Sequence, residues 1–181
     1  MAHQWVRERL RDGEVAVDAT AGNGKDSAFL ADCVGRGGKV YAFDIQPEAI
    51  LSAREELAKV GMLERVQLIE GDHAEMGRKV PPGDNIRAVM FNLGYLPGGD
   101  KHITTRGSST ILALGAALDL VAAGGILTVV IYTGHPEGKE EALAVEAWAD
   151  VLPPGFGGIR YTPVGRKDAP YLLAITRNGG R

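Results

Sequence analysis

Residues 15–26 constrain the fold more than any other segment, because they combine an apolar run, a glycine turn and a helix start. The two valines of the run are β-branched and favour a buried strand. Gly22 and Gly24 allow a tight turn and let a ligand approach the backbone closely. Asp26 and Ser27 can cap the helix that follows, whose first turn offers unpaired N–H groups and a partial positive charge. The segment therefore predicts a site for a nucleotide-type ligand at the carboxyl end of the first strand.

Two phosphate-binding motifs come close to this segment without matching it. A P-loop requires G-x-x-x-x-G-K-[ST], but Ala19 occupies the first glycine position and Asp26 the last position. A dinucleotide fingerprint requires G-x-G-x-x-G/A, and its third small position holds Ser27. Asp18, four residues before the first glycine, would place a carboxylate toward the ligand. This charge is unfavourable beside a pyrophosphate and favourable beside the ammonium group of S-adenosylmethionine. The pattern Asp-x-x-x-Gly-x-Gly resembles motif I of class I methyltransferases, and a structural turn with a capped helix is the alternative.

Composition and charge narrow the class of protein. The 181 residues suffice for one domain with a sizeable core, and 45% hydrophobic and 24% charged residues are ordinary for a globular protein. The formal net charge of −3 indicates no general basic field for nucleic acid, although it allows a local basic patch. The one cysteine, Cys33, excludes an internal disulfide and fits a reducing compartment. With no long apolar run, we expect one cytoplasmic domain over residues 1–181, without a membrane span and without metal ligands.

Predicted strands and helices alternate along the chain. The predicted strands cover residues 14–18, 39–44, 66–70, 86–91 and 126–132, and a closing hairpin pairs 159–163 with 171–176. The predicted helices cover residues 2–10, 26–34, 47–60, 108–121 and 140–151. This order predicts a single α/β, Rossmann-like domain, with a seven-stranded, mostly parallel sheet and an antiparallel hairpin at its C-terminal end. The strand at 126–132 is the most apolar, so we expect it at the centre of the sheet.

Polar residues close four of the predicted strands, namely Asp18, Asp44, Asp72 and Asn92. Ligands of such sheets bind outside the carboxyl ends of the strands, so we expect these side chains to surround one site. Asp44 lies 20 residues after Gly24, where an acidic residue can bind two ribose hydroxyls; capping of the next helix is the alternative. An aspartate at position 72 can accept the exocyclic amine of adenine. The predicted cofactor-binding residues are Asp18, Gly22, Asn23, Gly24, Asp26, Ser27, Asp44, Ile45, Gln46, Asp72, His73 and Asn92.

The four residues Asn92-Leu-Gly-Tyr95 resemble the Asn-Pro-Pro-Tyr signature of methyltransferases that modify nitrogen. Methyl transfer to nitrogen requires a neutral amine whose lone pair points at the sulfonium methyl group. An amide oxygen can hold an N–H and so orient that lone pair, and an aromatic ring can stack on a base. A strand-end turn residue and a packing aromatic are the alternatives for these two positions.

Two loops offer further polar side chains near the same edge. Asp100, Lys101, Thr104 and Arg106 follow the fourth strand and can contact phosphate or a substrate amine, although charged loop residues are often simply solvated. His135, after the fifth strand, is a candidate proton acceptor or RNA contact, with a turn role as the alternative.

Four blocks of the sequence, at residues 18–24, 92–105, 134–141 and 169–173, carry a resemblance to a known family. The chain resembles the rRNA methylase family of class I methyltransferases, which includes the MnmM-type (YtqB) tRNA methyltransferases, over nearly its whole length. The resemblance departs at Lys25 and Ser27, where histidine and threonine are common. It implies S-adenosylmethionine-dependent methylation of 5-aminomethyl-2-thiouridine at tRNA wobble position 34, which yields 5-methylaminomethyl-2-thiouridine.

The candidate residues come from the motifs, and the expected partners come from the resemblance. We expect Asn92, Tyr95 and Asp100 to act in catalysis, and Tyr95, Lys101, Thr104, Arg106, His135 and Lys139 to contact substrate or RNA. Arg166 and Lys167 are further basic candidates. The expected partner is a tRNA anticodon loop, and a homodimer is the expected assembly. The alternatives are methylation of rRNA or of a small amine, or a module that binds RNA without catalysis.

Overall fold

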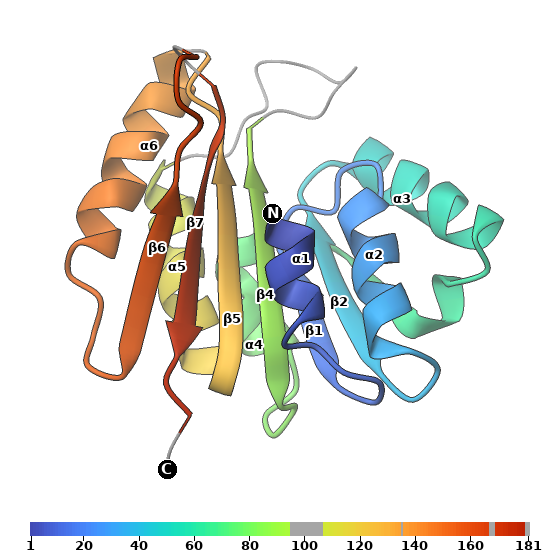
Figure 1. Ribbon diagram of the computed structural model, residues 1–181. Coiled ribbons are helices and arrows are strands. Elements are labelled where there is room, and N and C mark those ends of the chain that lie inside the picture. Colours follow the sequence, from blue (N-terminus) through green and yellow to red (C-terminus); the bar gives the residue numbers. More distant parts are fainter. Residues whose placement is uncertain (95–106, 135, 167–168, 180–181) are drawn as a thin grey trace.

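The computed structural model describes residues 1–94, 107–134, 136–166 and 169–179, which form a seven-stranded sheet with helices on both faces (Figure 1). The strands are β1 (Val15–Asp18), β2 (Lys39–Asp44), β3 (Val66–Glu70), β4 (Ile86–Leu93), β5 (Val121–Ile131), β6 (Phe156–Tyr161) and β7 (Tyr171–Arg177). Their order in the sheet is β3-β2-β1-β4-β5-β7-β6. The first five strands pair in parallel, whereas β7 pairs antiparallel with both β5 and β6. The predicted α/β sheet with a C-terminal antiparallel hairpin is therefore confirmed.

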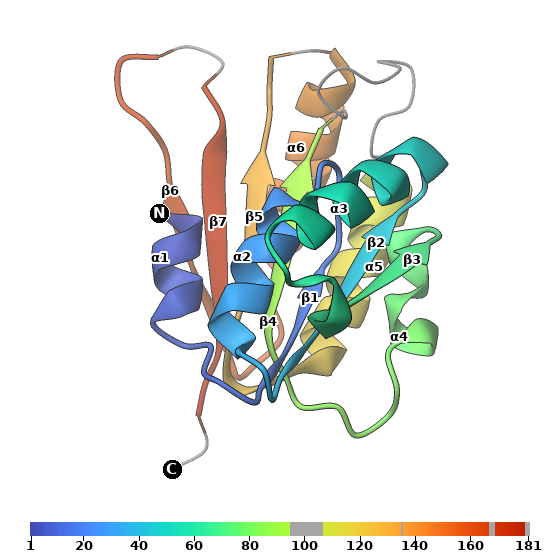
Figure 2. The ribbon, with the colours of Figure 1, turned by 90° about the vertical axis from the view of Figure 1, so that its right-hand side faces the viewer.

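Six helices cover the two faces of the sheet in the described part of the chain. They are α1 (Ala2–Arg7), α2 (Lys25–Val34), α3 (Pro47–Lys59), α4 (Met76–Lys79), α5 (Gly107–Leu120) and α6 (Pro136–Ala149), with short 3-10 helices η1 (Leu63–Arg65) and η2 (His73–Glu75). Helices α1 to α3 lie on one face and α4 to α6 on the other, as the two views show (Figures 1 and 2). None of the described helices is long and apolar enough to cross a membrane.

Strand periodicity divides the core between the two faces. In β4, Ala88 and Met90 belong to the core beneath α1 to α3, while Val89 and Phe91 belong to the core beneath α4 to α6. Successive side chains of a strand point to opposite faces, so a central parallel strand must be apolar at every position. This requirement explains the apolar run from Ala88 to Phe91 in β4.

The predicted central strand is wrong, and so are several predicted boundaries of helices and strands. β4 lies in the middle of the sheet, and β5 lies beside it, between β4 and the two strands of the C-terminal hairpin. Val121, expected on a helix face, instead starts β5 and pairs with Ile86, after which the register shifts so that Ala88 pairs with Ile126. Gly124, with φ +77°, lies in this irregular stretch. Helix α1 ends at Arg7, earlier than expected.

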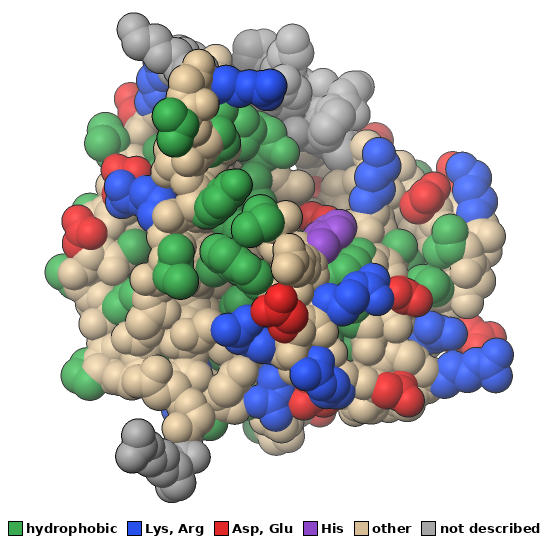
Figure 3. Space-filling view, viewed as in Figure 1, with side chains coloured by type: hydrophobic (Ala, Val, Ile, Leu, Met, Phe, Trp, Pro, Cys, Tyr) green, Lys and Arg blue, Asp and Glu red, His purple; other side chains and the backbone are tan. Residues whose placement is uncertain are grey.

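One face of the outer sheet carries exposed apolar side chains. Ile159 and Tyr161 of β6 are 64% and 47% exposed and pair with Ala174 and Leu172 of β7. Ala174 belongs to the core beneath α1 to α3, so all four side chains lie on that face of the sheet. Figure 3 shows green side chains gathered over this part of the molecule. We call these four residues the hairpin face.

The backbone of Gly24 packs closely against α3. Its φ is +79°, and a Cβ at this position would lie 2.8 Å from the Cα of Ala53. Gly61 is a matched comparison, because its φ is +69° while a Cβ there would meet no atom within 4 Å.

We predict that Gly24→Ala destabilises the protein much more than Gly61→Ala. Gly61→Ala should cost about 1–2 kcal/mol from the left-handed backbone alone. Gly24→Ala should cost about 1–3 kcal/mol beyond that, because the backbone of α3 must move. Chemical denaturation of both variants measures the difference, and equal losses would show that the contact with Ala53 is unimportant.

Candidate functional site

The carboxyl ends of β1, β2 and β4 meet at one edge of the sheet, at the top of Figure 1. The strand order reverses between β1 and β4, because β2 lies on one side of β1 while β4 and β5 lie on the other. Open α/β sheets bind ligands at such a point. The glycine turn after β1 lies here, and so do Asp44 at the end of β2 and Asn92 near the end of β4.

Asp44 fastens the glycine turn to the end of β2. One oxygen of its carboxylate accepts the N–H of Gly22 at 2.9 Å, and the other accepts the N–H of Gln46 at 3.0 Å. Each carboxylate oxygen has a second lone pair, so Asp44 can still accept two hydroxyl groups. The neighbouring Ile45 is 50% exposed, which gives this edge an apolar surface beside a carboxylate.

Asp18 supports the turn from beneath. Its side chain is fully buried, and its two oxygens accept the Ser27 hydroxyl at 2.6 Å and the Thr20 N–H at 3.1 Å. The expectation that Asp18 faces the ligand therefore differs from the structure, in which this carboxylate has no exposed surface. Ser27 and Asp26 do not cap α2 either, since Gly24 is its N-cap residue and no side-chain cap bond forms.

Burial shifts the titration of Asp18. Its pKa is raised from 3.8 to about 7, and removal from water is the largest cause. The charge of Asp26 raises the pKa as well, and the hydrogen bonds from Ser27 and Thr20 oppose the shift. The carboxyl therefore changes charge near neutral pH instead of near pH 4.

Asp72 and His73 lie at the end of β3, as predicted. Asp72 accepts the N–H of Ala74 at 2.9 Å and caps η2. His73 is 7% exposed, and its Nδ1 lies 3.1 Å from the carbonyl oxygen of Ala19. A carbonyl only accepts, so Nδ1 carries a proton in this pair. Nε2 is buried without a hydrogen-bond partner among the described residues, and it lies 3.9 Å from Asp72 Oδ1.

Asn92 lies within β4, one residue before its end, and not in the loop that was expected to start there. Its backbone N–H donates to the hydroxyl of Thr20 at 2.8 Å, and its side chain is exposed. Its amide nitrogen lies 3.5 Å from Asp26 Oδ2, and the other oxygen of Asp26 lies 2.6 Å from His3 Nε2. Neither Thr20 nor His3 was among the predicted site residues.

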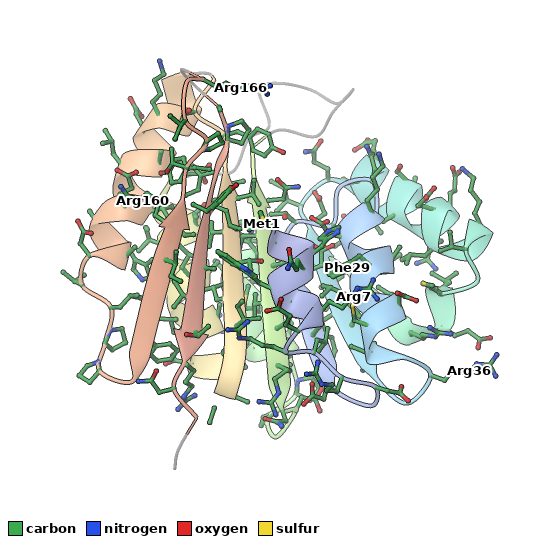
Figure 4. The ribbon with its side chains drawn as sticks, in the orientation of Figure 1. Met1, Arg7, Phe29, Arg36, Arg160 and Arg166 are labelled. Atoms are coloured by element: carbon green, nitrogen blue, oxygen red, sulfur yellow. The ribbon has the colours of Figure 1, made fainter. Side chains whose placement is uncertain are left out.

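The remaining predicted residues contribute less to this geometry. Asn23 accepts the hydroxyl of Ser52 at 3.3 Å, so its side chain is tied to α3. Lys139 and Arg166 are exposed, and Figure 4 shows Arg166 at the same edge of the molecule as the strand ends. The following predicted residues lie outside the described part of the chain: Tyr95, Asp100, Lys101, Thr104, Arg106, His135 and Lys167.

We predict that the raised pKa of Asp18 makes the wild-type protein less stable as the pH rises from about 4 to about 7. Below this window, both folded and unfolded chains hold the proton. Within it, the unfolded chain loses the proton first, so the free energy of unfolding falls, and above it the loss is complete. Asp18→Asn cannot titrate and keeps an acceptor for Thr20 and a donor for Ser27. Its stability relative to wild type should therefore rise across the window, by on the order of 1–4 kcal/mol. A constant difference between the two proteins in denaturation from pH 4 to pH 8 would contradict this assignment.

The chain is similar to known proteins over most of its length. The family model described as "Putative rRNA methylase" matches residues 40–177. A chloroplastic tRNA (mnm(5)s(2)U34)-methyltransferase of Arabidopsis thaliana is 43% identical over 161 residues, which cover 84% of this chain and 59% of the relative. The chain thus spans about three-fifths of the length of that relative.

Solved structures agree over almost the whole chain. A putative rRNA methylase from Clostridium thermocellum is 40% identical, with a TM-score of 0.93 over 97% of this chain and 94% of that one. A putative methyltransferase from Streptococcus mutans, in complex with SAH, is 33% identical, with a TM-score of 0.87 over the same shares. The fold of this chain is that of class I methyltransferases, and the chain belongs to the family described as rRNA methylases.

Proposed function

We propose that the protein is an S-adenosylmethionine-dependent N-methyltransferase. It converts 5-aminomethyl-2-thiouridine at tRNA wobble position 34 to 5-methylaminomethyl-2-thiouridine. The observation that carries the proposal is the exposed amide of Asn92, which lies 3.5 Å from Asp26 at the same sheet edge as the glycine turn and Asp44, in a chain 43% identical to a tRNA (mnm(5)s(2)U34)-methyltransferase. This amide can hold a substrate amine next to a bound methyl donor.

The residues at the strand ends fit the cofactor. The free lone pairs of Asp44 suit the ribose hydroxyls, and the exposed side chain of Ile45 suits one face of the adenine. The carboxylate of Asp72, whose side chain is 45% exposed, suits an exocyclic amine. When bound, S-adenosylmethionine supplies a methyl group on a positively charged sulfur. The carboxylates of Asp26 and Asp44 make this edge of the sheet favourable for such a cation.

The chemistry requires orientation more than acid–base catalysis. The neutral amine nitrogen attacks the methyl carbon; the new N–C bond forms as the S–C bond breaks, and S-adenosylhomocysteine leaves. The resulting ammonium group then loses a proton to water. Asn92 Oδ1 can accept one N–H of the amine and so direct the nitrogen lone pair along the line of attack. Correct alignment of two bound reactants contributes a large part of the rate.

The proposed partner is the anticodon loop of a tRNA. Its bases are single-stranded, so the target nucleotide reaches the site with little unpairing. Lys139 and Arg166 are exposed basic residues that can meet the phosphates, and we propose the loop residues Tyr95, Lys101, Thr104, Arg106 and His135 as further contacts. We also propose Asp100 as a catalytic residue and the cytoplasm as the location, since one cysteine fits a reducing compartment.

We further propose a homodimer that buries the hairpin face. Exposed apolar residues on an edge strand favour association, because they cover both apolar area and unpaired backbone groups. Ile159 and Tyr161 provide both features on β6. Light scattering on the purified protein gives the mass in solution, and a monomer at micromolar concentration would exclude this assembly.

An rRNA substrate is the second candidate, and the description of the family model is the observation that favours it. The two candidates differ in their acceptor and share the cofactor site.

We predict that the purified protein, with S-adenosylmethionine, converts 5-aminomethyl-2-thiouridine to 5-methylaminomethyl-2-thiouridine in tRNA taken from cells that lack this protein. Mass spectrometry of the nucleosides detects the product directly. Ribosomal RNA from the same cells is the matched comparison. Methyl transfer to rRNA alone would replace the tRNA proposal with the second candidate.

We predict opposite effects for two substitutions in the site. Asn92→Ala should lower kcat about 100-fold or more and leave the Kd of S-adenosylmethionine nearly unchanged, because it removes only the orienting group. Asp44→Asn should weaken cofactor binding about tenfold, because a hydrogen bond to a charged group is lost. Calorimetric titration and steady-state kinetics separate these effects. Unchanged turnover in Asn92→Ala would remove Asn92 from the mechanism.

A further inference from the structure

A chain of three polar side chains links helix α1 to the end of β4. Asp26, in the first turn of α2, stands between the other two. His3 Nε2 lies 2.6 Å from its Oδ1, and the amide nitrogen of Asn92 lies 3.5 Å from its Oδ2. Its side chain is only 19% exposed, compared with 50% for His3. The carboxylate therefore contacts, on its inner side, the same amide that is proposed to hold the substrate.

We propose that Asp26 is a positioning residue, anchored by His3, that fixes which end of the Asn92 amide faces the substrate; this inference rests on the proposed function. A carboxylate only accepts hydrogen bonds. It attracts the NH₂ end of the Asn92 amide and repels the carbonyl end. This choice persists at 3.5 Å because it depends on charge as well as on hydrogen-bond geometry. Asn92 Oδ1 is then directed away from Asp26 and remains available to accept an N–H of the amine.

The anchor of Asp26 comes from a separate helix. Because the carboxylate only accepts, Nε2 of His3 carries the proton in their pair. The His3 ring stacks on Phe29, with centroids 3.8 Å apart and planes 3° from parallel. The Arg7 guanidinium lies 5.2 Å from the centre of the same Phe29 ring and donates to Asp32 at 3.1 Å. Figure 4 shows Arg7 and Phe29 where α1 and α2 meet. These contacts hold α1, and with it His3, against α2.

The backbone of Asn92 is held independently of its side chain. Thr20 accepts its N–H at 2.8 Å, and the N–H of Thr20 itself is bound by Asp18. The position of Asn92 is therefore set by Thr20 and by its pairing with Val130 of β5, while Asp26 sets the rotation of its amide. A loss of Asp26 should disturb the rotation and leave the position intact.

The first test is Asp26→Asn, which keeps the size of the side chain but can offer either an N–H or an oxygen to Asn92. We expect kcat for tRNA methylation to fall about 10- to 100-fold. The Kd of S-adenosylmethionine should rise by no more than a few-fold, because one of the two carboxylate charges at this edge is lost while Asp44 remains. His3→Phe keeps a ring against Phe29 and loses the hydrogen bond, so it should lower kcat less. Glu56→Gln on α3, which breaks an ion pair with Lys59, is the control and should match wild type.

A double-mutant cycle tests whether Asp26 acts through Asn92. In an Asn92→Ala background, Asp26→Asn should have no further effect on kcat, because the group that it orients is absent. Equal effects in the two backgrounds would overturn the inference. A fall in cofactor affinity with unchanged kcat would also overturn it, and would restore the predicted direct contact between Asp26 and the cofactor.

Nuclear magnetic resonance tests the inference without turnover. The side-chain NH₂ signals of Asn92 are identified as the pair that is missing from Asn92→Ala. In Asp26→Asn these signals should shift strongly, and in Glu56→Gln they should not move. If the signals do not move in Asp26→Asn, the inference is overturned, whether or not the wild-type protein methylates tRNA. A wild-type protein that is inactive on tRNA overturns only the proposed function.

Discussion

Two carboxylates hold the glycine turn between β1 and α2, and the rest of the site depends on that turn. Asp18 binds it from beneath through Thr20 and Ser27, and Asp44 binds Gly22 from the neighbouring strand. A glycine turn loses more conformational freedom on folding than other turns do, so it requires such bonds to keep one shape. The turn also places the hydroxyl of Thr20 where it accepts the backbone N–H of Asn92. One loop thus aligns the ends of three strands.

The same interactions give the site its charge. Asp26 and Asp44 stand at this edge as carboxylates, and the buried Asp18 titrates near neutral pH with a pKa of about 7. Negative charge at the mouth of the site favours a sulfonium cofactor and disfavours a pyrophosphate. The charge of Asp18 was one reason why the sequence does not predict a dinucleotide site. The structure supplies a different physical reason for Asp18 itself, because its carboxylate supports the turn and does not reach the surface.

Much of the sheet and of the cofactor edge could be predicted from local patterns. The bounds of β2 and β3 agree with prediction, and Asp18, Asp44 and Asn92 lie near the strand ends as expected. Local periodicity fixes such features, because alternation and glycine positions are properties of neighbouring residues. The prediction that β5 is the central strand was wrong, since the order of the strands depends on how distant strands pair in the assembled sheet. The prediction that Val121 belongs to a helix was wrong, because β5 begins at Val121 with an irregular stretch around Gly124 before its regular part.

The sequence by itself determined the fold class, the turn and the polar strand ends, because each depends on residues close together in the chain. Only the tertiary structure brought His3, Asp26 and Asn92 into one chain of contacts, since 23 residues separate the first pair and 66 the second. It also decided that the carboxylate of Asp18 is buried while that of Asp26 keeps some exposure, a difference set by the packing of α2 on β1. Contacts between distant segments form only when the core is assembled, so no local sequence pattern predicts them.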